Sequence, residues 1–331
     1  SSASWLESSL NANAVLTIGA GVAVRGEAGG QGGSVVGNQP ILLKGMIAAG
    51  ASGKTLWVLG TLVNDGARLE AGNGGTLEVA GTVTNTGSTL MLNSVAGGTP
   101  GTLKLSGSIG GGRLTGPMGT LVNASGSTAK LNAVLLDTDL TVDNNSRLTI
   151  QNGLTLANGH RLSINSDGNN TFLTFTGASQ TLGGQGKVVF GGTSSANWLE
   201  SSLDANAVLT IGAGVTVDGG AGGRDANVYA YQAIDVRGEI GTDVGGSRIK
   251  VSGNLMTPGS WLLLDGDGQL TVGGRHEGGT ISASEGGQAL LASSGAVWSA
   301  LTLDGDAALL NNCRLTIQNG LTLANGHRLS I

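Results

Sequence analysis

The chain has 331 residues, of which 61 are glycine and only 12% are charged, a composition atypical of a compact globular enzyme. Its hydrophobic fraction of 39% is nevertheless too high for a disordered glycine-rich linker. A net charge of -5 without any lysine or arginine run argues against binding to nucleic acid. No apolar run approaches the ~18 residues of a membrane-spanning helix, so we expect no transmembrane segment.

The first segment of the chain occurs twice. SSASWLESSLNANAVLTIGAGVAV begins at Ser1, and SSANWLESSLDANAVLTIGAGVTV begins at Ser194, an offset of 193. Towards the end, NNSRLTIQNGLTLANGHRLSI begins at Asn144 and its near-copy begins at Asn311, an offset of only 167. The second copy has therefore lost 193 − 167 = 26 residues.

The lost residues correspond to a place near 72 to 97 in the first copy. A shorter period explains their number, because TLWVLGTLVN from Thr55 matches TLEVAGTVTN from Thr76, an offset of 21. A solenoid coil contacts only its neighbours and can be lost whole. We therefore predict one continuous solenoid made of a first long repeat, 1–193, and a second one, 194–331, that is one coil shorter and truncated at its end.

Apolar and polar residues alternate in short bursts, the period of a strand with one buried face. Leu140, Leu148, Leu154 and Leu162 are 8, 6 and 8 residues apart, so one circuit takes 22 residues and three strands. Asn-Gly and Asp-Gly pairs between the bursts supply the positive φ of sharp corners; they are Asp65-Gly66, Asn152-Gly153, Asn158-Gly159 and Asp167-Gly168.

This pattern predicts an all-β fold, a right-handed parallel β-helix (β-solenoid) with three short strands and about 21–22 residues per coil, hence roughly 15 coils. The 8-residue steps exclude a left-handed hexapeptide helix. Propeller blades need about 40 residues per unit. Comparing the copies also predicts facing: Trp57 matches Lys250 between apolar neighbours, and Arg68 matches Trp261, so all four should point outward.

The chain resembles the β-helical repeat regions of large bacterial exoproteins, namely autotransporter passengers and two-partner-secreted adhesins of the filamentous haemagglutinin type. The segments that carry the resemblance are GTLVNDGARLEAGNGGTLEVAGTVTNTGSTLMLNS from Gly60 and NNSRLTIQNGLTLANGHRLSI from Asn144. The resemblance covers nearly the whole chain and rests on pattern and composition. It implies secretion, surface display, and adhesion or matrix building.

Paired acids are the first candidate site. Asp137 and Asp139 recur as Asp304 and Asp306, and residues i and i+2 of a strand lie ~7 Å apart on one face, which suits paired-carboxylate hydrolysis of polysaccharides. The alternative is a polar corner, which the replacement of Thr138 by Gly305 favours. We expect the polar corner, and no catalytic residues.

The same acids, together with Asp265 and Asp267, are the candidates for Ca²⁺. Neither an EF-hand loop nor the glycine-rich nonapeptide array is present, so we expect no cofactor, with Ca²⁺ kept as an alternative. The segments Gly26 to Gly33 and Gly219 to Gly223 are glycine-rich corners. Val188 follows Gly186-Lys187 where a phosphate loop needs Ser or Thr, so nucleotide binding is not supported.

The single histidines and the lone cysteine do not indicate a metal or catalytic site. His160 and His327 occupy equivalent corners several coils apart and cannot share one metal or triad, and His276 has no histidine partner. We expect all three to be exposed turn residues. Cys313 replaces Ser146 of the first copy and reads as a small residue in a half-buried strand.

Outward aromatics are the stronger binding hint. Sugar faces stack on exposed rings, and the candidates for a glycan or partner surface are Trp57 and Trp261, together with Tyr229 and Tyr231 on a loop.

We expect a non-enzymatic, extracellular structural or adhesive rod, a stalk or fibre segment of a bacterial surface protein. Because the segment at Ser1 also occurs internally, it is an ordinary coil that would expose strand edges. Either the chain belongs to a longer array or copies stack end to end into filaments. The alternative function is a polysaccharide-binding or polysaccharide-cleaving β-helix protein.

Overall fold

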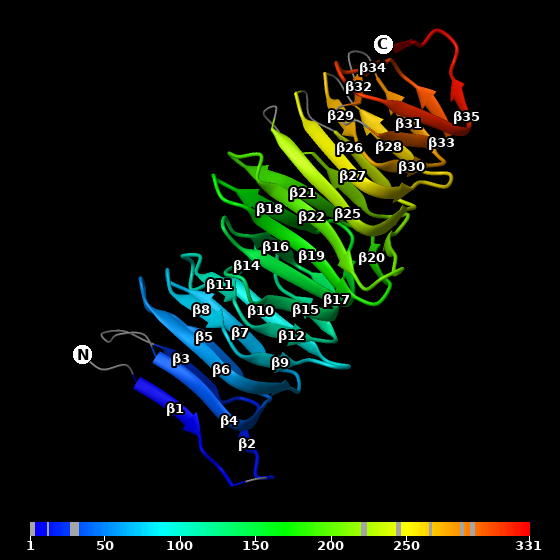
Figure 1. The fold of residues 1–331 in the computed structure, drawn as a ribbon. Coiled ribbons are helices and arrows are strands. Elements are labelled where there is room, and N and C mark those ends of the chain that lie inside the picture. Colours follow the sequence, from blue (N-terminus) through cyan, green and yellow to red (C-terminus); the bar gives the residue numbers. More distant parts are fainter. Residues whose placement is uncertain are drawn as a thin grey trace. The chain divides into compact units, whose positions relative to one another are not determined.

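The computed structural model describes residues 4–11, 13–26, 33–219, 224–242, 246–264, 267–284, 288–291 and 295–331. These residues confirm the predicted all-β, parallel β-solenoid, without helices and with about 13 turns of roughly 23 residues. They form two compact units, Ser1–His160 and Arg161–Ile331. Figure 1 shows strands of consecutive turns side by side within each unit.

The first unit contains strands of three to eleven residues. They are β1 Ser4–Ser8, β2 Leu16–Ile18, β3 Ala23–Gly26, β4 Gly33–Leu43, β5 Met46–Ala49, β6 Thr55–Asn64, β7 Arg68–Gly72, β8 Thr76–Val79, β9 Thr82–Thr84, β10 Thr89–Ala96, β11 Thr102–Leu105, β12 Ser108–Gly110, β13 Arg113–Thr115, β14 Leu121–Ala124, β15 Ala129–Asp137, β16 Asp139–Val142 and β17 Arg147–Leu156.

The strands of the second unit repeat this pattern. They are β18 Arg161–Ser166, β19 Thr171–Gly177, β20 Gln180–Gly184, β21 Lys187–Gly192, β22 Asn197–Leu203, β23 Leu209–Ile211, β24 Thr216–Asp218, β25 Asp225–Val236, β26 Glu239–Thr242, β27 Arg248–Met256, β28 Trp261–Leu264, β29 Gln269–Val272, β30 Arg275–Glu277, β31 Thr280–Ala283, β32 Gln288–Leu291, β33 Ala296–Asp304, β34 Ala307–Leu309, β35 Leu315–Leu323 and β36 Leu329–Ser330.

Each turn contributes three strand segments, as predicted. In the first unit β8, β9 and β10 lie on β6 and β7 of the preceding turn, all in parallel register. The long strand β6 covers two faces because it bends at Gly60, which has φ 78°. The turns are slightly longer than predicted because some corners carry loops, as in the 26-residue step from Thr76 to Thr102. About 13 turns therefore replace the 15 expected.

Glycine forms a column at this bend. Gly60 lies in register with Gly37. A Cβ atom at Gly60 would collide with the backbone of Gly37, one at Gly81 with Gly60, and one at Gly107 with Gly81. The predicted Asn-Gly and Asp-Gly corners are confirmed by positive φ at Gly66, Asn152, Gly153, Gly159 and Gly168.

The core is a stack of aliphatic columns. In the second unit one buried column runs through seven successive turns, and it consists of Leu162, Val188, Val217, Ile240, Leu262, Ile281 and Leu303. The predicted facing is also confirmed. Leu56 and Val58 are buried while Trp57 between them is half-buried, and Trp261 is 48% exposed beside the buried Leu262.

The missing 26 residues equal one complete turn. In the first unit Thr55 pairs with Thr76, and Thr76 pairs with Thr102. In the second unit Arg248, which matches Thr55, pairs directly with Gln269, which matches Thr102. The second copy therefore omits the turn between them and keeps its register.

Candidate functional site

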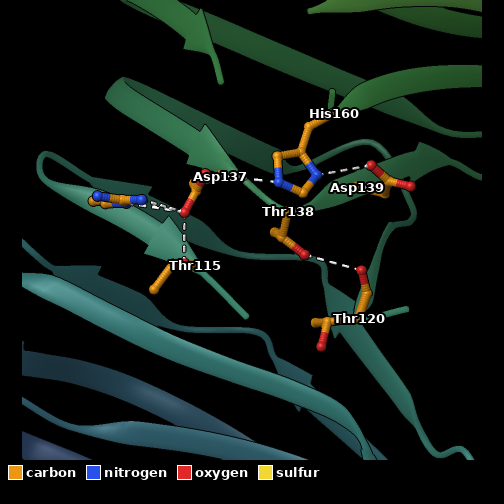
Figure 2. A network of polar contacts seen from close by, with 7 residues as sticks. Thr115, Thr120, Asp137, Thr138, Asp139 and His160 are labelled. Atoms are coloured by element: carbon orange, nitrogen blue, oxygen red, sulfur yellow. Dashed lines mark hydrogen bonds and ion pairs between the residues drawn. The ribbon is translucent and has the colours of Figure 1, made fainter. Parts of the chain in front are cut away.

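The acidic pair lies at a corner. Asp137 is the last residue of β15 and Asp139 is the first of β16. Thr138 between them is buried, and its Oγ1 donates a hydrogen bond of 2.9 Å to the carbonyl oxygen of Thr120 in the preceding turn (Figure 2). The chain bends here with both carboxylates outside, so the pair belongs to a polar corner and does not lie within one strand.

An imidazole lies between the two carboxylates. His160 follows Asp139 by 21 residues, one turn of the solenoid. Its Nδ1 is 3.1 Å from Asp139 Oδ1, and its Nε2 is 3.6 Å from Asp137 Oδ1. Figure 2 shows the ring with one nitrogen directed to each acid. The histidine therefore links two strands of one turn from the corner of the next.

Asp137 is also held from the preceding turn. β13 lies in register with β15, with Thr115 opposite Asp137. The Thr115 hydroxyl donates to Asp137 Oδ2 at 2.6 Å, and Arg113 donates to the same oxygen from Nε at 3.0 Å and from Nη2 at 2.5 Å. Burial alone would raise the pKa of Asp137, but these hydrogen bonds and the positive charges of Arg113 and His160 outweigh it and lower the pKa.

The second copy repeats the arrangement in a looser form. His327 Nε2 lies 3.6 Å from Asp304 Oδ1, and its Nδ1 lies 3.6 Å from Asp306 Oδ1. Ser282 replaces Thr115 and donates to Asp304 Oδ2 at 3.2 Å. Position 280, which matches Arg113, is threonine, so the guanidinium of the first copy has no counterpart. The histidine and its two acids are common to both copies and the arginine is not.

Sequence reasoning missed the histidine's role. His160 and His327 were expected to be exposed turn residues, yet their side chains are about one-third exposed and each contacts two carboxylates. The signal was available: 160 − 139 = 21 is one predicted coil, which places His160 above the acids. The histidines do not share a site with each other, as expected from their separation.

His276 was predicted wrongly. It is fully buried in β30, at a position that matches the core residue Ile109 of the first copy. The Thr257 Oγ1 lies 2.8 Å from its Nε2 and donates to the carbonyl oxygen of Gly278, so Nε2 carries the proton and donates to Thr257. Burial lowers the pKa of His276 to about 4.

Metal ligands do not converge in the described residues. No group of three or more His, Cys, Asp or Glu side chains there is arranged to hold a metal ion. Asp267 accepts a hydrogen bond from the backbone of Gly246, whereas Asp265 lies outside the described residues, as do the centres of the glycine-rich segments 26–33 and 219–223. Cys313 is half-buried, as expected, but lies just before β35 and not within a strand.

The candidate aromatic surface separates into distinct places. Tyr229 and Tyr231 were expected on a loop but lie in β25, where alternation directs both outward; their ring centroids are 4.3 Å apart and tilted by 55°. Tyr231 is 60% exposed. Trp57 and Trp261 make no ring contact with any described residue. The tyrosines therefore form a pair, while each tryptophan stands by itself.

The fold defines the class of the protein as a parallel β-solenoid. Comparison with protein-family models, curated proteins and solved structures finds no match for this chain. No helix able to span a membrane occurs within the described part of the chain.

Proposed function

We propose that this chain is a non-enzymatic structural and adhesive segment of a large bacterial surface or secreted protein. The observation that carries the proposal is the lost turn: Arg248 pairs with Gln269 as Thr55 pairs with Thr76, so a whole turn is dispensable. A catalytic site would need a fixed neighbourhood, whereas a spacer needs only stacked turns. Duplication here extends the stack and alters its polar corners.

The corner network supports the same role. Asp137 is engaged by Arg113 and Thr115 and has a lowered pKa, which suits a permanent ion pair. A glycosidase acid needs a raised pKa near neutrality. The corner therefore acts as a clamp between three successive turns. Secretion and display at the cell surface or in the matrix follow from the resemblance to bacterial exoproteins.

The partners we propose are further β-solenoid turns, either repeats of the same chain or copies stacked end to end, and cell-surface glycans. Electron microscopy of the purified chain across a dilution series tests self-association. Fibres that persist on dilution, with an axial repeat of ~4.8 Å, are the expected result for end-to-end stacking. Isolated particles at every concentration would reject stacking and leave the role as a spacer within a longer chain.

A second candidate, polysaccharide cleavage, is favoured by one observation. Burial raises the pKa of Asp143, in the corner after β16, against the opposing charge of Lys104. A raised pKa suits a general acid better than a lowered one. Reducing-end release from a panel of polysaccharides tests this function, with Asp143→Asn and Asp137→Asn as variants. Turnover lost in Asp143→Asn would establish cleavage, and no release by the parent chain would reject it.

A further inference from the structure

An open groove lies on one outer face of the first unit. It has a volume of about 650 Å³, crosses β9, β12 and β15 of successive turns, and reaches Gln151 of β17 in the next turn. Its polar lining consists of Thr82, Thr84, Thr86, Ser108, Lys130, Asn132 and Gln151. Volumes between 300 and 1,000 Å³ are typical of small-ligand sites. The groove could therefore admit one or two sugar units of a longer chain.

The groove is hollow because the outward residues of β9 and β12 are small. Thr82, Ser108 and Lys130 stand in register on consecutive turns, and Thr84, Gly110 and Asn132 form the adjacent row. Ser108 Oγ donates to Thr82 Oγ1 at 3.1 Å, and Asn132 Oδ1 accepts from Asn152 Nδ2 at 2.8 Å, so the lining offers the Thr82 hydroxyl hydrogen and the Asn132 amide N–H groups as donors over a floor of strand backbone. These groups donate and accept hydrogen bonds in several directions, which matches the hydroxyl-rich surface of a saccharide.

Lys130 gives the groove its charge. Among the described residues no carboxylate lies within ion-pair distance of its ammonium group, whereas Lys44, Lys104 and Arg113 each contact an acid. Lys130 is half-buried at the groove and not fully solvated. An unneutralised cation in a polar groove favours a ligand that brings a negative charge.

In the second copy, larger side chains occupy the position equivalent to the groove. Arg275 replaces Ser108, and Glu277 replaces Gly110. The guanidinium of Arg275 donates to Glu277 Oε2 at 3.1 and 3.2 Å and to Gln318 Oε1 at 2.9 Å, and Gln318 is the counterpart of the groove residue Gln151. Lys130 is replaced by Val297. The second copy thus fills the groove and removes its charge together.

We propose that the groove over β9, β12 and β15 binds a carboxylated saccharide, with Lys130 pairing with the carboxylate and the hydroxyl and amide groups holding the ring. This site rests on the glycan-binding part of the proposed function and names its ligand class, but it does not depend on the spacer role, which requires only stacked turns. Electron microscopy of filaments or isolated particles therefore tests the spacer role, and saccharide affinity tests the binding site.

Calorimetric titration of the full chain with an oligogalacturonate tests the site, and the methyl-esterified oligomer provides the uncharged comparison. The variant Ser108→Arg/Gly110→Glu installs the filling of the second copy. A Cβ atom at Gly110 meets no neighbouring atom within 4 Å, so this side is open to substitution. Lys130→Val removes the charge alone. Thermal unfolding monitored by circular dichroism verifies that each variant is folded.

We expect the filled variant and Lys130→Val each to bind the oligogalacturonate at least tenfold more weakly than the parent chain does. We expect the parent chain to bind the methyl-esterified oligomer as weakly as Lys130→Val binds the oligogalacturonate. The reciprocal variant Arg275→Ser/Glu277→Gly/Val297→Lys should gain a second site. Absence of binding to the parent chain, unchanged affinity in the folded filled variant, or equal affinity for the two oligomers would overturn the proposal.

Discussion

Trp298 lies in register with His276, one turn further along the same inward column of the second unit. Both side chains are fully buried, and they replace Ile109 and Leu131, which stack in the same way in the first unit. His276 Nδ1 and Trp298 Nε1 both lack a hydrogen-bond partner among the described residues. One copy thus has two bulky polar rings where the other has aliphatic packing.

Acid should destabilise the second unit through His276. The folded pKa of about 4 lies below the ordinary value of 6.5, so the unfolded chain binds the proton more readily. Stability is therefore lost as the pH falls from about 6.5 towards 4, by about 3 kcal/mol in all. Urea unfolding at pH 7 and at pH 4.5 measures the loss.

The matched variant is His276→Ile, which installs the residue of the first copy. We expect it to remove most of the difference in unfolding free energy between pH 7 and pH 4.5. If the variant and the parent chain lose the same stability over this range, other groups titrate and the assignment to His276 is wrong.

Replacing Arg113 by the second copy's threonine should loosen the corner in the first unit. Arg113→Thr removes two hydrogen bonds and one positive charge from Asp137, so the pKa of Asp137 should rise. The pair is partly exposed, so we expect a stability loss of roughly 1 kcal/mol or less at pH 7. An NMR titration of the Asp137 carboxyl carbon measures the pKa.

Stability should also become less dependent on acid in this variant. A carboxyl with a lowered folded pKa contributes stability that is present above its unfolded pKa and is lost as the pH falls. Arg113→Thr has less of this stability to lose. An unchanged Asp137 titration would show that Thr115 and His160 hold the pKa without the arginine.

Deleting residues 76–101 should leave a folded solenoid. The deletion joins Gly75 to Thr102, which then takes the place of Thr76 opposite Thr55, as Gln269 does opposite Arg248. We expect an unchanged β-sheet circular dichroism spectrum per residue and a cooperative thermal transition. Deleting only 76–88, half of the turn, should abolish that transition. The deletion would place strands from one face of the solenoid next to strands from a different face of the neighbouring turn. Equal behaviour of the two deletions would contradict whole-turn modularity.

The glycine column should tolerate no side chain at its tight positions. Gly81→Ala brings a Cβ atom against the backbone of Gly60, so we expect a loss of about 2–3 kcal/mol in unfolding free energy. Gly110→Ala is the control, because its Cβ atom meets nothing within 4 Å. The control should be neutral or slightly stabilising, since alanine restricts the unfolded chain. The urea midpoints of Gly81→Ala, Gly110→Ala and the parent chain measure these effects. Equal midpoints for the two variants would contradict the predicted collision.

Much of the fold could be predicted from the sequence because the structure of a solenoid depends on local periodicity. The alternation around Trp57, the glycines at the corners and the 26-residue loss all reflect contacts between adjacent turns. The site was harder to predict, since His160 contacts acids from the previous turn and its partners depend on the exact turn length. His276 was missed because a single polar residue in an inward position has no effect on the period. The tyrosines were placed on a loop, although the small apolar residues Val228 and Ala230 that alternate with them are buried and mark a strand.

The equivalence of Thr76 and Thr102 has a genetic consequence. Both residues occupy the same position of the turn, so an unequal crossover between the coding segments of neighbouring turns joins two strands that already share a face and a register. Such an event changes the protein by one whole layer and creates no new junction to be accommodated. The gene can therefore lengthen or shorten by whole turns, and both the corners, as at Arg113 and Thr280, and the core, as at Ile109 and His276, record how the two copies have diverged.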